Sequence, residues 1–163
     1  MLGSAGGTTT MFGTQTEVDP VSHMIGTAVG WGGNPRSAAI YDSGFPKANE
    51  GKTVHTITVK GVPVDGFWSI SLYNAKGYFE KNDLGAYSVN NLTAKPNPDD
   101  SFTIQFGGGQ KDTPNFLPIM PGWNYIVRLY PSAFRDLERY IEVSRSAVQT
   151  GKVRSSGTSN PTK

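Results

Sequence analysis

The amino-acid sequence predicts one mainly β domain of the sandwich or barrel type, with a short N-terminal helix and a C-terminal helix. Its 163 residues include 20 glycines and 11 prolines, and this frequency of turn residues suits many short strands. The clearest strand places Trp68, Ile70 and Leu72 on one face, with other residues alternating between them. A chain of this length is expected to form one domain with a sizeable core.

The N-terminal part divides into a lead-in and a helix. Residues 1–13 are rich in Gly and Thr and offer little to bury, which predicts a flexible lead-in. Asp19 is suited to cap a helix whose first residue is Pro20. Apolar residues then recur at helical spacing from Val21 until Gly30 ends the pattern. We expect a short amphipathic helix at the start of a single domain that spans residues 14–148.

The central part of the chain predicts a series of strands separated by turns. Apolar and polar residues alternate within each segment, and Gly, Pro, Asn and Asp bound the segments. The expected strands cover residues 38–41, 53–60, 67–73, 87–90, 102–106 and 124–130. Residues 107–122 contain several glycines and prolines and are too long for a plain connection, so we expect a functional loop there.

After Pro131 the period of the apolar residues changes to that of a helix. Ser132 is a suitable cap, and Phe134, Leu137 and Ile141 fall on one stripe, which Val148 extends. This pattern predicts a C-terminal helix that ends near residue 148. The polar composition of residues 149–163 predicts a disordered tail.

Composition and charge argue against several classes of protein. The net charge is +2 and the Lys and Arg residues are scattered, so no nucleic-acid partner is expected. No apolar run approaches the roughly 20 residues that a membrane span needs, and residues 1–10 lack the features of a signal peptide. The absence of cysteine removes disulfides, thiolate nucleophiles and cysteine metal ligands. The compartment stays open.

Motifs for the common catalytic and metal sites are also absent. The sequence contains no Gly-x-Ser-x-Gly, no His-Glu-x-x-His and no calcium-loop pattern. The glycines of residues 107–111 lack the spacing of a phosphate loop. We therefore expect neither a metal site nor a cofactor.

The candidates for catalysis are His55, Tyr87 and Arg128. His55, one of two histidines, shares a strand face with Ile57 and Val59. A hydrogen-bonded core histidine is the simpler interpretation of that position, and a general base is the alternative.

Arg128 is the charged residue best suited to a binding site, because its neighbours on the same strand face are apolar or aromatic. Such an arginine needs a partner, which can be a carboxylate such as Asp65 in a structural ion pair, backbone carbonyls, or the anionic group of a ligand. Trp68 is expected in the core, whereas the tryptophans of the Gly- and Pro-rich loops are expected to be partly exposed. The candidate ligand-binding residues are Arg128, Tyr130, Tyr73, Trp31 and Trp123.

Several short motifs along the chain together resemble a known family. They are Gly33-Asn34-Pro35, Phe67-Trp68-Ser69, Tyr87-Ser88, Leu117-Pro118 and Arg128-Leu129-Tyr130. In this order they resemble the DUF1214 domain, usually the C-terminal half of bacterial proteins that begin with a DUF1254 domain. The resemblance implies a jelly-roll-like β-sandwich and a bacterial, periplasmic or secreted setting. It implies no particular reaction, because the family has no settled biochemical function.

Two classes of function fit these observations. The first is a module that binds a small molecule, a glycan or a partner domain, and the alternative is a hydrolase-like enzyme with a cleft built from His55, Tyr87 and Arg128. The binding module is preferred, because no nucleophile and base stand at a recognisable spacing. The resemblance also implies a DUF1254-like partner domain. Without that domain, apolar surface would be left open, so self-association is expected as well.

Overall fold

A computed structural model of the chain shows a mainly β fold with two sheets and one short helix. It describes residues 11–29, 33–35, 37–62, 64, 66–130 and, as backbone only, 149–151. The elements in chain order are α1 (Pro20–Val29), β1 (Ile40–Gly44), β2 (Val54–Val59), β3 (Phe67–Tyr73), β4 (Ser88–Asn90), β5 (Phe102–Phe106), β6 (Phe116–Leu117), β7 (Asn124–Tyr130) and β8 (Gln149–Gly151).

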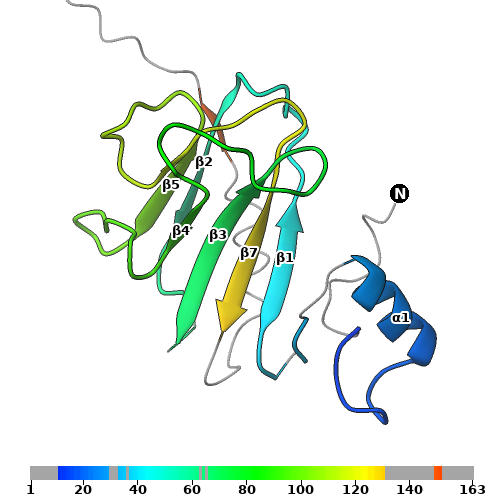
Figure 1. Cartoon of the computed structure of the whole chain (residues 1–163). Helices are drawn as coiled ribbons and strands as arrows, with labels where there is room; N and C mark the ends of the chain where they lie inside the picture. The colour runs from blue at the N-terminus through cyan, green and yellow to red at the C-terminus, as the bar shows by residue number, and fades with distance from the viewer. Residues whose placement is uncertain are drawn as a thin grey trace, which may run out of the picture.

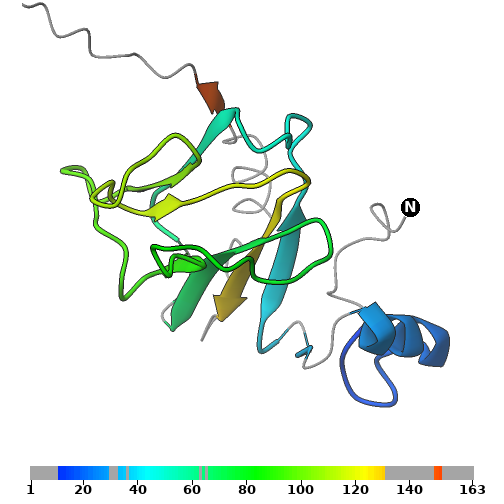
Figure 2. The same cartoon turned by 45° about the horizontal axis from the view of Figure 1, so that its top comes forward.

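The strands of the described residues form two four-stranded sheets, seen as separate layers in Figures 1 and 2. Sheet A has the strand order β1-β7-β3-β4, and its strand pairs are antiparallel. Sheet B has the order β6-β5-β2-β8, in which β6 runs parallel to β5 and the other pairs are antiparallel. The long central strands β3 and β7 therefore pair directly, although some 50 residues separate them in the sequence.

The core collects the inward-facing residues of both sheets. On β7, Tyr125, Val127 and Leu129 are buried while the residues between them are half-buried, as period-two alternation predicts. Trp68 on β3 is 5% exposed, which confirms its predicted place in the core. The buried cluster consists of Ile40, Ile57, Val59, Trp68, Ile70, Leu72, Val89, Ile104, Phe106, Leu117, Trp123, Tyr125, Val127 and Leu129.

Helix α1 begins where the sequence predicts. Its first residue is Pro20, and the backbone N–H of Ser22 donates to the Asp19 carboxylate at 2.8 Å, so Asp19 caps the first turn. Figures 1 and 2 both show α1 standing apart from the two sheets. Its apolar residues Val21 and Met24 are exposed. Among the described residues, no helix combines the length and the apolar character that crossing a membrane requires.

Residues 107–122, expected from the sequence as a functional loop, are not a loop throughout. They contain β6, which extends sheet B beside β5. The Asn115 side chain donates to the carbonyls of Lys95 and Thr103 and accepts from the backbone N–H of Lys95. Asn115 takes a left-handed conformation (φ 50°), which asparagine adopts more readily than most residues. These bonds fasten the segment to its neighbours.

The expectations for the C-terminal helix, Trp31, the C-terminal tail and the first strand have different outcomes. The predicted C-terminal helix and Trp31 lie outside the described residues. Three residues of the expected tail are described, and they form β8, an edge strand that pairs with β2. At the other end of the sheets, β1 begins at Ile40 and ends at Gly44, slightly later than its apolar pattern indicates.

Candidate functional site

The face of sheet A that points away from the core carries hydroxyl and aromatic side chains around one arginine. We call it the outer face of sheet A. The strand register places Arg128 of β7 between Tyr41 of β1 and Ser69 of β3. Because side chains alternate along each strand, this face includes Tyr41, Phe67, Ser69, Ser71, Tyr73, Ile126, Arg128 and Tyr130.

Arg128 is half-buried and bonds to neutral hydroxyl groups. Its Nη1 donates to Ser71 Oγ at 3.0 Å, and its Nη2 donates to the Tyr73 hydroxyl at 2.6 Å. The guanidinium carbon lies 5.7 Å from the centre of the Tyr73 ring, within the range of a cation–π contact. No carboxylate of the described residues forms an ion pair with Arg128. Asp65, the partner considered from the sequence, lies outside the described residues.

A row of three aromatic rings continues from Arg128. Tyr73 stacks on Phe79 with ring centres 4.9 Å apart, and Phe79 lies 5.5 Å from Tyr87. Phe79 is exposed and belongs to the segment between β3 and β4, which loops past the ends of the strands (Figure 1). The row therefore forms an aromatic wall beside the arginine, and one of its members faces solvent.

Asn74 holds the start of the segment that carries Phe79. Its side-chain oxygen accepts hydrogen bonds from the backbone N–H groups of Lys76 and Tyr78, and its amide donates to Glu80 at 2.7 Å. Asn124 on β7 also donates to the Asn74 carbonyl. An asparagine that bonds its own backbone two residues on is a common device for fixing a turn, and here it positions the aromatic wall.

A second polar group lies toward the β1 edge of the same face. Asn34 donates to the Tyr41 hydroxyl at 2.6 Å, and the rings of Tyr41 and Tyr130 meet edge to face at 6.3 Å. Burial raises the pKa of Tyr130, a hydrogen bond with Tyr41 and the proximity of the Tyr41 hydroxyl add to the increase, and the charge of Arg128 opposes it. The positive charge of Arg128 therefore interacts with the Tyr130 hydroxyl.

His55 and Trp123 lie in a different part of the molecule. His55 on β2 is 2% exposed, its Nδ1 lies 2.9 Å from the Thr53 carbonyl oxygen, and its ring meets that of Trp123 edge to face. The interpretation of His55 as a hydrogen-bonded core histidine is confirmed. The expectation that Trp123 is partly exposed is wrong, because its ring stacks on Phe106 and is fully buried.

The structure thus brings some of the sequence candidates together and separates others. Arg128, Tyr73 and Tyr130 share the outer face of sheet A, and Tyr87 joins them through Phe79. His55 lies on the buried face of sheet B and does not share a cleft with them. In the described part of the chain, no three side chains of His, Asp or Glu gather as metal ligands would.

Sequence reasoning missed three residues around Arg128, two on the outer face of sheet A and one in the aromatic wall. Ser71 and Tyr41 face outward by simple alternation, but their contact with β7 depends on strand pairing that no local pattern specifies. Phe79 lies outside any strand. One feature of the sequence does point to this face. Ser69 and Ser71 alternate with the apolar residues of β3, which indicates that the side of β3 facing away from the core is polar.

Comparison with known families places the chain. The model of the family described as "Protein of unknown function (DUF1214)" matches residues 39–133, which include both central strands and every residue named on the outer face of sheet A. The chain belongs to the DUF1214 family. The resemblance drawn from the sequence motifs is therefore confirmed. A comparison with curated proteins gave no match.

Solved structures of two bacterial proteins resemble this DUF1214 chain. The VPA0106 protein from Vibrio parahaemolyticus matches with a TM-score of 0.63 and 28% identity, over 78% of this chain and 35% of its own. A putative uncharacterized protein from Burkholderia cenocepacia matches with a TM-score of 0.42 and 20% identity, over 64% of this chain and 28% of its own. This chain thus spans about a third of the length of these proteins.

Proposed function

We propose that this DUF1214 domain is a binding module and that the outer face of sheet A binds a small anionic molecule at Arg128. The observation that carries the proposal is the half-buried Arg128, whose guanidinium has neutral hydroxyl groups as its described hydrogen-bond partners. The jelly-roll connectivity implied by the family resemblance remains part of this proposal. The two sheets with a shared core support it.

The charge of Arg128 argues for an anionic ligand. Removing a charge from water is unfavourable unless an opposite charge or several hydrogen bonds compensate. The guanidinium has five N–H donors in a fixed fork, and its planar edge matches a carboxylate or phosphate. Ser71 and Tyr73 accept two of the five. An anion on the free side of the fork would accept others and balance the charge.

The aromatic wall narrows the class of ligand. Phe79 presents an exposed ring stacked on Tyr73, and Tyr73 in turn contacts the guanidinium. Aromatic side chains supply large contact areas at low conformational cost. A ligand that joins an acidic group to a ring, such as an acidic saccharide, would use both the arginine and the wall. The hydrolase alternative has less support, because His55 is remote from this face.

Titration of defined compounds tests the proposal. Calorimetry with glucuronate, glucose and acetate separates the contributions of the carboxylate and the ring, and glucuronate is expected to bind most tightly. In Arg128→Met the affinity for glucuronate should fall about tenfold or more, as expected when a charge-assisted hydrogen bond is lost. Lys111→Met, which removes an exposed cation outside this face, should bind as the wild type does.

Three results would overturn this function. The first is equal affinity for glucuronate and glucose. The second is an unchanged affinity for glucuronate in Arg128→Met when the far-ultraviolet circular dichroism shows that the variant is folded. Absence of any heat with the three compounds at about 10 mM, a range in which weak sites are still detectable, would also count against it.

A second candidate function, docking of a partner domain, is favoured by α1. Val21, Met24 and Ile25 occupy positions i, i+3 and i+4 of one helix face, and they are 58%, 65% and 38% exposed. The helix stands apart from the sheets (Figures 1 and 2). The match with VPA0106 leaves about two thirds of that protein unaccounted for. We propose that a further domain of a longer chain covers this helix face.

Superposition on VPA0106 tests the docking candidate. The residues of VPA0106 that correspond to Val21, Met24 and Ile25 should contact the part of that chain outside the match. Solvent at those positions would reject a partner domain. If analytical ultracentrifugation instead finds the isolated chain as a dimer and the Met24→Gln variant as a monomer, a second copy of the chain, and not another domain, covers this helix face.

A further inference from the structure

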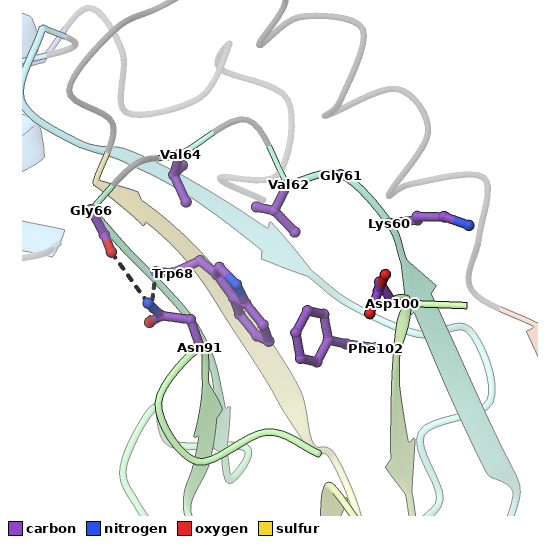
Figure 3. A pocket seen from close by; sticks show the side chains of 9 residues that line it. All are labelled: Lys60, Gly61, Val62, Val64, Gly66, Trp68, Asn91, Asp100 and Phe102. Carbon is purple, nitrogen blue, oxygen red and sulfur yellow. Dashed lines mark hydrogen bonds between the residues drawn. The ribbon is translucent and has the colours of Figure 1, made fainter. Parts of the chain in front are cut away.

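A separate pocket opens where β2 leads into β3, on the core side of the sheets (Figure 3). Its volume is about 420 Å³, within the range of small-molecule sites. Because Trp68 belongs to the inward face of β3, this pocket is distinct from the outer face of sheet A. The residues that line it are Lys60, Gly61, Val62, Val64, Gly66, Trp68, Asn91, Asp100 and Phe102.

The middle of the pocket is apolar. The rings of Trp68 and Phe102 meet edge to face with centres 5.3 Å apart. Val62 and Val64 are partly buried and pack against the same core. Figure 3 shows Val62, Trp68 and Phe102 pointing toward one another, with Asn91 at one end and Asp100 and Lys60 at the other. An apolar group placed here would contact aromatic and aliphatic side chains together.

Asn91 has a structural task at its end of the pocket. Its amide donates to the Gly66 carbonyl at 3.2 Å, and its oxygen accepts from the backbone N–H of Trp68 at 3.4 Å (Figure 3). These bonds hold the start of β3 against the end of β4 and fix the wall that contains Trp68. The side chains that are better placed to bind a ligand are therefore Lys60 and Asp100, at the opposite end of the pocket.

The charges at that end favour a cation. Lys60 forms an ion pair with Asp99 at 3.4 Å. The Asp100 carboxylate has no hydrogen bond or ion pair within the described residues. Among the described residues, one ammonium and two carboxylates leave a net charge of −1 at this end of the pocket. The turn before β5 positions Asp100. In this turn the backbone N–H of Asp100 donates to the Asn97 carbonyl, and the φ of Asp100 is 63°.

We propose that this pocket binds an organic ammonium ion. The apolar body of the ligand lies against Val62, Trp68 and Phe102, and its cationic head lies beside Asp100. Aromatic faces attract cations through the ring quadrupole, and a nearby carboxylate adds a direct electrostatic attraction. A ligand with an anionic head of the same size meets the unpaired Asp100 and is repelled.

A series of compounds with one chain and three head groups tests the proposal. The ¹⁵N-labelled chain is titrated with hexylammonium, hexanol and hexanoate, and NMR follows the backbone amides and the indole signal of Trp68. Hexylammonium should shift the Trp68 indole signal and bind about three- to fivefold more tightly than hexanol, the range expected for a partly exposed ion pair. Hexanoate should bind most weakly.

Three variants separate the contributions of charge and cavity. Asp100→Asn should bring hexylammonium to the affinity of hexanol, and asparagine tolerates the left-handed backbone at this position. Asp83→Asn, which removes an exposed carboxylate outside the pocket, should change nothing. Val62→Phe fills the cavity and should weaken all three probes while the chain remains folded.

The proposal fails under any of three outcomes. Equal affinities for the three probes would show that the pocket does not select a cation. An unchanged preference of Asp100→Asn for hexylammonium over hexanol would show the same. If the NMR signal of the Trp68 indole does not shift with hexylammonium at about 10 mM, a concentration that detects even weak sites, the pocket is not a binding site for it.

Discussion

Arg128 and Tyr73 are joined by a hydrogen bond of 2.6 Å between the guanidinium and the phenolic hydroxyl, although Arg128 lies opposite Ser69 in the sheet. The arginine side chain therefore runs along β3, past Ser71, to reach a residue four positions further on. Its apolar stem then helps to cover Ser69 and Ser71, both buried although they face away from the core. The pair fixes the arginine beside the aromatic wall.

This pair should be measurable by a double-mutant cycle. We expect Arg128→Met and Tyr73→Phe to show a coupling of about 1 kcal/mol in the free energy of unfolding, since hydrogen bonds to charged groups contribute about 1.5–3 kcal/mol and partial exposure reduces that value. Urea denaturation of the wild type, both single variants and the double variant gives the coupling. A cycle with Arg128→Met and Tyr78→Phe, an exposed tyrosine, should give none.

Trp68 should contribute strongly to stability. It is 5% exposed within the core cluster and meets Phe102 edge to face, so Trp68→Ala removes a large buried side chain and leaves a cavity. The expected cost is about 3–5 kcal/mol. Chemical denaturation measures it, with Leu92→Ala, an 81% exposed position, as the control. A cost below about 1 kcal/mol would contradict the burial.

The strands could be predicted from the sequence because their pattern is local. Trp68, Ile70 and Leu72 alternate within one strand, and the same holds for Tyr125, Val127 and Leu129; period-two burial needs no knowledge of the partner strand. The cap of α1 was equally local, since Asp19 bonds a residue three positions away.

The site could be predicted only in part, because it depends on contacts between distant segments. Arg128 was recognisable as a charge on an otherwise apolar or aromatic strand face, but its partners Ser71 and Tyr73 precede it by 57 and 55 residues. Nothing local states that β3 pairs with β7. Trp123 was misjudged for a related reason: its glycine- and proline-rich surroundings describe the backbone, whereas its burial comes from Phe106 on another sheet.

Two glycines with similar backbone conformations should respond differently to alanine. Gly51 and Gly77 have φ values of 84° and 82°, so Cβ strain at both costs about 1–2 kcal/mol. A Cβ at Gly51 would also lie 2.6 Å from the Met120 carbonyl carbon, whereas a Cβ at Gly77 meets nothing within 4 Å. We expect Gly51→Ala to unfold about 1–3 kcal/mol more easily than Gly77→Ala. Thermal and urea denaturation measure the difference, and equal losses would contradict it.

The raised pKa of Tyr130 should make stability depend on pH in the alkaline range. Burial and the hydrogen bond with Tyr41 favour the protonated phenol in the folded chain, so its pKa lies above that of the unfolded chain, about 10. Below about pH 10 both states hold the proton, and the stabilising contribution is fully present. As the pH rises through the folded pKa, the unfolded chain has already released its proton and the contribution is lost.

The free energy of unfolding should therefore fall more steeply above about pH 10 in the wild type than in Tyr130→Phe, which keeps the ring and cannot ionise. Urea denaturation at several pH values between about 8 and 11 compares the two proteins, and only their difference matters, because other tyrosines and lysines titrate in both. Tyr78→Phe, at an exposed position, should keep the slope of the wild type. If Tyr130→Phe keeps that slope too, the hydroxyl of Tyr130 is not buried beside Tyr41 in solution as it is in the structure.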